Sequence, residues 1–194
     1  MEETYGHDGT RPMSGAEKVD FLDICKLRQS CRGFSERPVE HDKLVKCVEA
    51  GRLTHSGCNS QPWSFVVVEN PEMVSEISKC GRQLKQNAFL GTAKAFIVIL
   101  EEHALLSPVI SCFLDSQYYA KGDLGAAAAY ICLEATTQGL GSCHIGLYDR
   151  AKICELLDIP AEKQFGAVIA LGYPAGDAIR SKNRKPFEDI VRFV

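Results

Sequence analysis

Three short apolar runs, rich in β-branched residues, interrupt the chain and predict strands. They cover residues 64–69, 95–100 and 167–172, and the first is closed by Asn70 and Pro71, which favour a turn. Apolar runs without polar alternation are typical of strands covered on both faces. We therefore expect the first two runs to be fully buried in a sheet.

Helical spacing of apolar residues predicts five helices around these strands. The predicted helices cover residues 18–29, 41–52, 72–90, 122–138 and 149–157. The fourth is rich in alanine, which lets a helix pack closely on several sides, and it ends at a glycine, Gly139. The pattern as a whole predicts an α+β domain with this helix at its centre.

Three further segments need a separate interpretation. Residues 1–17 are polar and contain glycine, so we expect a flexible leader before a single domain of residues 18–194. Residues 101–121 have no consistent period, and irregular segments of this length are often mobile lids over a site. Residues 190–194 alternate in apolar character and predict a strand at a sheet edge.

Composition limits what the chain can bind. With 194 residues and 45% hydrophobic side chains, it can bury one sizeable core. A net charge of −3 gives no bulk attraction for nucleic acid or for an anionic membrane, although local cations can still hold an anion. We expect the partners to be small molecules or other proteins.

The nine cysteines do not predict a disulfide framework. No two form a Cys-x-x-Cys pair, their number is odd, and most lie within apolar patterns, as small buried side chains do. The chain also has no signal peptide and no apolar run of about 18 residues. We therefore expect a reducing, cytoplasmic location and no membrane contact.

Cations near the end of the first predicted helix mark a candidate anion site. Arg28 and Arg32 offer forked donors, and Ser30 offers a hydroxyl, to a compact polyanion such as a phosphate monoester. Lys182 and Arg184, at the far end of the chain, could enclose the same phosphate. A solvated basic surface has the same composition, and spacing alone does not choose between the two interpretations.

Other familiar sites do not fit. Residues 139–144 resemble the dinucleotide-binding fingerprint, but they follow a helix and His144 replaces the third glycine. Neither a Walker phosphate loop nor a G-x-S-x-G nucleophile elbow is present. His55, Cys58 and Asn59 have the side chains of a thiol hydrolase, but neighbours on one loop rarely aim a nucleophile at its base. The scattered histidines predict no metal site.

Four blocks of sequence, taken in order, resemble the nitroreductase family of flavin enzymes, and the resemblance covers nearly all of residues 20–194. The blocks are residues 28–34, 56–63, 139–146 and 182–186. The resemblance implies a nitroreductase-like α+β fold, in which helices flank a mostly antiparallel central sheet. It also implies a homodimer with FMN at the subunit interface and a C-terminal segment exchanged onto the partner, a role that suits the last apolar residues.

The resemblance assigns the phosphate end of FMN to one subunit. Arg28, Lys182 and Arg184 should hold the phosphate, while Gln29 and Ser30 should contact the phosphate and ribityl region. The same block also contains Arg32, which should lie at the other end of the ribityl chain.

The same resemblance assigns residues to the flavin ring. Arg32 should lie near the ribityl chain and the pyrimidine edge, where a cation stabilises the negative charge of reduced flavin. From the other subunit, one loop should meet the isoalloxazine through His55, Ser56 and Asn59. Along the other side, with a backbone N–H that reaches N5, should lie His144, Ile145 and Gly146.

The implied activity is oxidoreduction in a ping-pong sequence. NADH or NADPH gives a hydride to FMN and leaves, and a nitroaromatic, quinone or related small acceptor then takes its place. This chemistry requires no side-chain acid, base or metal, so we predict no catalytic residue. The family often has proline where His55 stands and a bulky residue where His144 stands, and either histidine could donate a proton to the substrate. For His144, packing beneath the cofactor is the favoured interpretation.

Two alternatives stay open. A specialised family member, such as a reductive dehalogenase or a flavin-fragmenting enzyme, would grip its substrate with a dedicated lid. Residues 101–121 hold two tyrosines but no charged cluster that matches such a lid. A non-catalytic flavin-binding protein would keep the cofactor residues and lack a productive site for NAD(P)H.

Overall fold

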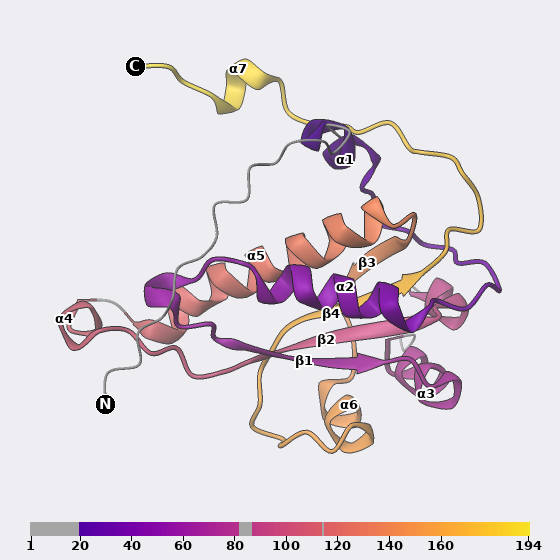
Figure 1. Ribbon diagram of the computed structural model, residues 1–194, viewed down its shortest axis with the longest axis horizontal. Coiled ribbons are helices and arrows are strands. Elements are labelled where there is room, and N and C mark those ends of the chain that lie inside the picture. Colours follow the sequence, from indigo (N-terminus) through magenta and orange to yellow (C-terminus); the bar gives the residue numbers. More distant parts are fainter. Residues whose placement is uncertain (1–19, 82–86, 114) are drawn as a thin grey trace.

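One antiparallel sheet lies at the centre of the computed structural model, which describes residues 20–81, 87–113 and 115–194. Its four strands have the order β1-β2-β4-β3 (Figure 1). They are β1 (Trp63–Val68), β2 (Ala95–Glu101), β3 (Gly141–Ile145) and β4 (Phe165–Gly172). The predicted antiparallel sheet and the three predicted strands are confirmed.

The sequence pattern misses β3. This strand contains a glycine, a serine and a histidine, so it lacks the apolar run that marks the other three. Tertiary contacts define it instead, because His144 pairs with Ile169 of β4 and Ser142 forms a parallel bridge to Ser30 on the opposite side. Its position therefore depends on segments that lie far away in the sequence.

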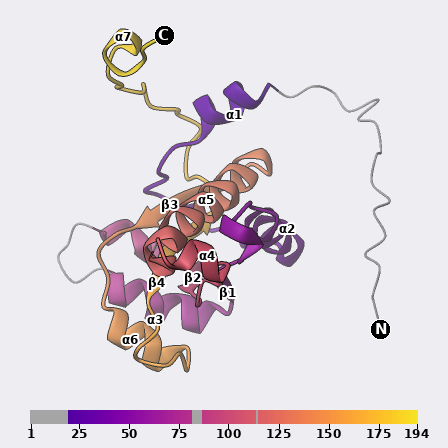
Figure 2. The same cartoon turned by 90° about the vertical axis from the view of Figure 1, so that its left-hand side faces the viewer.

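Helices cover both faces of the sheet (Figure 2). One face packs against α2 (His41–Arg52) and α5 (Ser116–Thr137), and the other packs against α3 (Pro71–Gly81) and α6 (Arg150–Leu156). Because side chains alternate along a strand, β2 contributes to both of the resulting hydrophobic cores. The α+β architecture thus has a core on each side of its sheet.

Burial along the strands follows their position in the sheet. β2 lies in the middle and is buried from Ala95 to Leu100, as predicted. β1 lies at the edge, and its Val67 is 37% exposed, so the prediction that this run is fully buried is wrong. The helices cover an edge strand only in part, and the apolar sequence of β1 does not reveal this.

Most helices are found where the sequence predicts them, with one clear exception. α2 and α6 match their predicted ranges closely, and α1 (Phe21–Leu27) is shorter than predicted. The single helix predicted over residues 72–90 is wrong, because α3 ends at Gly81 and a 3₁₀ turn, η2 (Ala88–Thr92), follows later. Leu90 of η2 packs so closely on Gly81 that a Cβ there would lie 2.3 Å from Leu90 Cδ1.

The segment predicted to be irregular, residues 101–121, is largely ordered. α5 begins earlier than predicted because the carboxylate of Asp115 accepts hydrogen bonds from two backbone amides of the first turn. A short helix, α4 (Pro108–Ser111), precedes it. The side-chain oxygen of Gln117 accepts from the backbone N of Ala104 at 2.6 Å and ties the segment to α5. A closing motion of this segment stays a prediction.

The C-terminal tail leaves the body of the molecule (Figure 2). It carries the short helix α7 (Phe187–Ile190), and residues 191–194 belong to no strand, so the strand predicted there is wrong within this chain. The free side of β3 is not available to it, because Ser30 already bridges there. Exchange of this tail with a partner subunit stays a prediction.

Cysteine burial agrees with expectation for most positions. Six of the nine cysteines are buried and none forms a disulfide, whereas Cys58 and Cys112 are exposed. None of the helices within the described ranges is long and apolar enough to cross a membrane. The predicted leader, residues 1–17, and residues 82–86 of the predicted third helix lie outside the described residues.

Candidate functional site

The segment that contains Arg28 runs from the end of α1 along β3. Arg28 is the C-cap residue of α1, and the backbone N of Cys31 then donates to the carbonyl oxygen of Ser142 at 2.9 Å. Only glycine fits opposite this crossing, because a Cβ on Gly141 would lie 2.7 Å from the Sγ of Cys31. The glycine of the third block therefore lets the Arg-rich segment lie against the sheet.

The C-terminal tail meets the same segment. Lys182 Nζ donates to the carbonyl oxygen of Arg28 at 2.6 Å, so the structure brings together the two distant groups of cations that the sequence singles out. Arg184 donates to the carbonyl oxygen of its neighbour Asn183 at 2.8 Å and makes no described contact with the Arg28 segment.

Arg180 is a residue of this region that the sequence interpretation missed. Its Nε donates to the side-chain oxygen of Gln29 at 3.1 Å, and its guanidinium also donates to the carbonyl oxygen of Ser30. The amide nitrogen of Gln29 in turn donates to the carbonyl oxygen of Ala178 at 3.0 Å. The Gln29 amide therefore binds the tail. No sequence signal marks Arg180, which precedes the basic run and resembles an ordinary surface arginine.

The cations of this region lack carboxylate partners. Across the described part of the chain, no ion pair involves Arg28, Arg32, Arg180, Lys182 or Arg184. The pKa of His144 is lowered, first by loss of hydration and then by the positive charge of Arg28. The residue nevertheless stays accessible to solvent. Uncompensated cations that converge on one place favour an anionic ligand.

A cleft of about 300 Å³ lies beside Arg28, between α1, α5 and β3. His144 and small residues of α5 line it, including Gly125 and Ala129. Ser142 shares the face of β3 with His144, and its buried Oγ has no partner among the described residues. Such an orphaned hydroxyl needs a polar partner, which a ligand or a water molecule can supply.

The three residues predicted along one side of the flavin ring differ in exposure. His144 and Gly146 are exposed, whereas Ile145 is 3% exposed and packs in the hydrophobic core. Alternation along β3 causes this difference. Only the backbone of Ile145 is therefore free to meet a ligand.

A second hollow, of about 730 Å³, lies at the start of α5. His55 and Ser56, from the loop after α2, line it together with Tyr118, Tyr119 and Lys121. The loop continues into a 3₁₀ turn, η1 (Gly57–Asn59), which ends in the exposed Asn59. The Oγ of Ser56 accepts from the backbone N of Gln61 at 2.9 Å and fixes the loop internally.

The two hollows are separate within one chain. Arg28 and His144 line only the first, and His55 and Ser56 line only the second. This separation accords with the expectation that each chain contributes halves to two sites, which stays a prediction. No group of three or more His, Cys, Asp or Glu side chains within the described ranges could hold a metal ion.

A family model described as the nitroreductase family matches residues 26–94 and, in an overlapping match, residues 71–173. Together these matches cover more than half of the chain. The chain belongs to the nitroreductase family. The family predicted from the four sequence blocks is confirmed.

Curated nitroreductase relatives resemble the chain over most of its length. A protein of Archaeoglobus fulgidus, named provisionally as an NADH dehydrogenase or NAD(P)H nitroreductase, is 32% identical over 159 residues, which cover 80% of this chain and 86% of the relative. A protein of the same name from Methanothermobacter thermautotrophicus is 30% identical over 162 residues, covering 81% and 79%. An iodotyrosine deiodinase of Thermotoga neapolitana is 26% identical over 166 residues, covering 79% and 88%.

Solved nitroreductase structures share the fold. A nitroreductase family protein from Clostridium difficile 630 superposes with a TM-score of 0.75 at 25% identity, covering 90% of this chain and 98% of that one. An FMN-dependent nitroreductase from Clostridium difficile R20291 gives a TM-score of 0.70 at 26% identity, covering 89% and 98%. The predicted nitroreductase-like α+β fold is confirmed.

Proposed function

We propose that this chain is an FMN-dependent oxidoreductase that uses NADH or NADPH to reduce nitroaromatic, quinone or related small acceptors. The contact between Lys182 and Arg28 carries the proposal, because it gathers cations from both ends of the domain at one place. The names of the relatives support it, since they include NAD(P)H nitroreductases and an FMN-dependent nitroreductase.

The cations at the end of α1 and in the C-terminal tail fit the phosphate end of FMN. A phosphate monoester needs positive charge and several donors, and Arg28, Lys182 and Arg184 supply both without competing carboxylates in the described part of the chain. Lys182 uses one of its three N–H donors on the carbonyl oxygen of Arg28 and keeps two for a ligand. We assign Ser30 and Arg32 to the adjoining ribityl chain and pyrimidine edge.

Gln29 and Arg180 serve this site in another way. The two side chains are hydrogen-bonded to each other. Each also donates to a backbone carbonyl oxygen of the opposite segment, Gln29 to Ala178 of the tail and Arg180 to Ser30. We therefore assign them the role of holding Arg28 and Lys182 together. The side-chain amide of Gln29 has two N–H donors, and this network uses one of them on Ala178, so the other stays available for phosphate contact.

The second hollow fits the flavin ring of a partner subunit. We assign His55, Ser56 and Asn59 to the isoalloxazine across a homodimer interface. α5 supports such an interface, because its middle, residues 124–133, has no polar side chain on any side yet leaves Ala129 and Tyr130 exposed, and helices of that composition belong in an interior.

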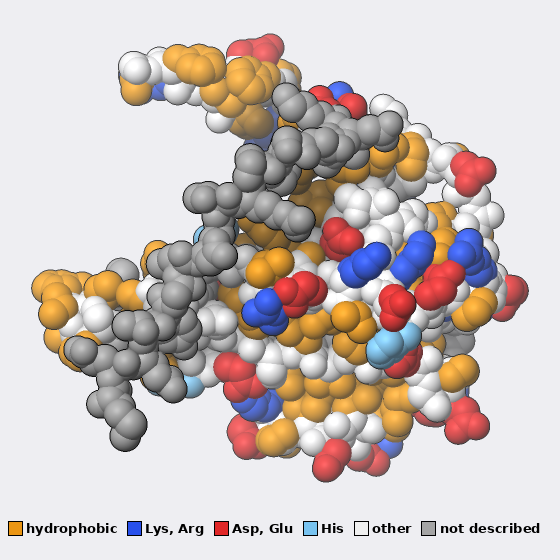
Figure 3. Space-filling view, viewed as in Figure 1, with side chains coloured by type: hydrophobic (Ala, Val, Ile, Leu, Met, Phe, Trp, Pro, Cys, Tyr) orange, Lys and Arg blue, Asp and Glu red, His pale blue; other side chains and the backbone are white. Residues whose placement is uncertain are grey.

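The C-terminal tail supports the same dimer. Phe187, Ile190 and Phe193 are exposed, and the space-filling view shows hydrophobic side chains gathered along the tail (Figure 3). A partner subunit that receives this tail would cover them. We place the dimer in the cytoplasm, where nine unpaired cysteines persist.

The role that we assign to the residues of this chain is to bind the flavin and to orient it. When bound, FMN supplies the redox chemistry, taking a hydride from NAD(P)H and passing electrons to the acceptor in a ping-pong sequence. His144 has a lowered pKa and is therefore neutral at physiological pH, so it can offer a hydrogen bond without adding charge beside Arg28. We assign no side chain as a catalytic acid or base.

Purified protein tests the proposal directly. We expect a yellow protein, or one that takes up added FMN, whose flavin absorbance bleaches under anaerobic conditions with NADH or NADPH and returns on addition of a nitroaromatic or quinone. Protein that fails to bind added FMN would refute the proposal. A screen of acceptors then ranks the substrates.

Reductive dehalogenation is the second candidate function. The relative named iodotyrosine deiodinase favours it, because that protein matches 79% of this chain. Iodotyrosine turnover by protein reduced in advance distinguishes the two, since a deiodinase releases iodide whereas a general reductase leaves the carbon–iodine bond intact. Protein that binds FMN but bleaches with neither nicotinamide would instead be a flavin-binding protein.

A further inference from the structure

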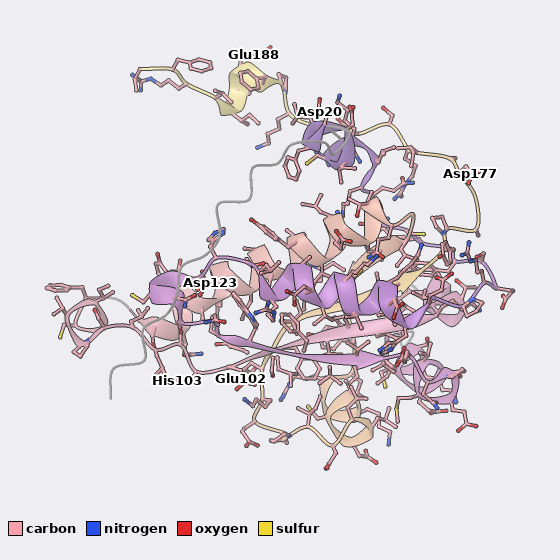
Figure 4. The ribbon with its side chains drawn as sticks, viewed as in Figure 1. Asp20, Glu102, His103, Asp123, Asp177 and Glu188 are labelled. Carbon is pink, nitrogen blue, oxygen red and sulfur yellow. The ribbon has the colours of Figure 1, made fainter. Side chains whose placement is uncertain are left out.

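Asp123 of α5 is a buried carboxylate beside the loop that we assign to the flavin ring. It is 8% exposed and is the only charged residue that is buried among those the structure describes. Its Oδ2 accepts a hydrogen bond from the backbone N of Gly57 at 3.1 Å. Figure 4 labels Asp123 on α5, near the end of α2. A buried charge is stable only when it is hydrogen-bonded, so this contact holds both groups in place.

The backbone N–H of Gly57, which Asp123 binds, has no acceptor within its own turn or at the N-cap position. Gly57 is the first residue of η1, and the first amides of a helical turn have no acceptor within the turn. A side chain at the N-cap normally accepts from them, but Ser56 makes no such bond. Asp123 therefore caps η1 from a different element and ties the loop to α5.

The ring of Tyr119, one turn before Asp123 on α5, also packs against Gly57. Tyr119 and Asp123 lie four residues apart and so share a face of the helix. A Cβ on Gly57 would lie 2.3 Å from Cε1 of Tyr119, so the backbone of the loop lies directly against the ring. Two successive turns of α5 thus fix Gly57 through its amide and its Cα.

The loop needs this support because its backbone is strained. Three residues without the freedom of glycine have positive φ: Cys58 (51°), Asn59 (52°) and Gln61 (48°). Such conformations cost about 1–3 kcal/mol each and persist only where the surroundings impose them. Without an external tie, the loop would relax to other conformations.

We propose that Asp123 is a positioning residue for the flavin ring: it binds Gly57 and so holds His55, Ser56 and Asn59 in the one arrangement that meets the isoalloxazine. The proposal rests on the proposed function, because that function assigns the loop to the ring. Asp123 also lines the second hollow, but its Oδ2 is bonded to the backbone N of Gly57, so we assign its effect on the ring to the loop that it holds. Its effect should therefore appear at the ring end of the cofactor and leave the phosphate end unchanged.

The test compares FMN with riboflavin, which lacks the phosphate. Asp123→Ala should weaken the binding of both flavins by the same factor, about tenfold or more, because one charge-assisted contact and the ring-binding loop are lost together. The ratio of the two dissociation constants should stay that of the wild type, and the absorbance spectrum of bound FMN should change. Asp123→Asn should restore part of the loss, because its carbonyl oxygen can still accept from Gly57.

Glu134→Gln is the matched control on the same helix. Among the described residues, the carboxylate of Glu134 accepts only from Thr137 of its own helix turn, so its loss should change neither flavin affinity nor the spectrum. If Asp123→Ala does not fold, Asp123→Asn decides the question through a smaller but equal loss for both flavins.

Three outcomes overturn the proposal. They are unchanged affinity and spectrum in both Asp123 variants, a change in thermal stability alone, and a loss of FMN affinity without a matching loss for riboflavin. A wild-type protein that binds no flavin would instead refute the proposed function.

Discussion

Removal of the cations at the meeting point of the two chain ends should weaken FMN binding by a predictable amount. A hydrogen bond to a charged group contributes about 1.5–3 kcal/mol, which corresponds to about 10- to 150-fold in a dissociation constant. We expect Arg28→Ala to fall in this range. Lys182→Ala should fall there too, and it also removes the 2.6 Å bond to the carbonyl oxygen of Arg28 that holds the tail.

Because we assign both side chains to one phosphate, their effects should not add. The double variant should lose less binding free energy than the sum of the single losses, as expected for groups that share a partner. Titration of apoprotein with FMN, followed by quenching of flavin fluorescence, measures each dissociation constant. Riboflavin provides the reference, since the loss should disappear when the ligand has no phosphate.

Lys185→Ala is the matched control in the same tail. Lys185 is exposed, and it makes no hydrogen bond or ion pair within the described residues. Its removal should leave FMN affinity almost unchanged. An equal loss for Lys185→Ala and Lys182→Ala would show that the basic run acts only as a diffuse charge. Unchanged affinity in both Arg28→Ala and Lys182→Ala would show that the phosphate binds elsewhere.

Three further variants test other parts of the argument. Arg180→Ala should lower FMN affinity, and Arg180→Lys should not restore it, because an ammonium cannot reproduce the contacts of the guanidinium to Gln29 and Ser30; restoration by lysine would contradict this. His144 has a pKa below its ordinary value of 6.5, so the folded apoprotein binds fewer protons than the unfolded chain and its stability should fall as pH drops through about 6.5. Urea denaturation from pH 8 to about 5 should show this slope, and His144→Gln should flatten it; an identical slope would show that other groups cause it. Tyr130→Glu places a charge on the exposed face of α5 and should convert the proposed dimer to a monomer with weaker FMN binding, as sedimentation velocity can measure; a variant that is dimeric like the wild type would place the interface elsewhere.

Local pattern was sufficient for the parts of the fold whose residues act locally. β2 and β4 are continuous apolar runs, and α2 has a clear helical stripe, so periodicity alone identifies them. Asp115 is a typical N-cap residue and could have marked the start of α5. The sequence before it has no helical periodicity, so this start was not recognised. β3 could not be found this way, because a bridge to Ser30 and pairing with β4 define it.

The candidate site shows the same difference between what local sequence predicts and what tertiary contacts define. Residue types and order marked Arg28 and Lys182 as candidates, yet their contact spans a sequence separation of 154 residues, which no local pattern encodes. The assignment of His55 to a different site from Arg28 came from the family resemblance. Arg180 and Asp123 were missed because their importance lies in single backbone partners, the carbonyl oxygen of Ser30 and the amide of Gly57.

The meeting of Arg28 with Lys182 also sets when the cofactor can be captured. A ribosome releases the N-terminal segment first, so α1 and the end of the Arg-rich segment emerge long before the tail exists. The proposed phosphate site of Arg28 and Lys182 is incomplete until Lys182 has been synthesised and the intervening sheet has folded to bring it back. FMN therefore cannot template early folding of the nascent chain. Cofactor loading should instead follow completion of the polypeptide, and flavin content should report on the fraction of chains that have been finished and folded.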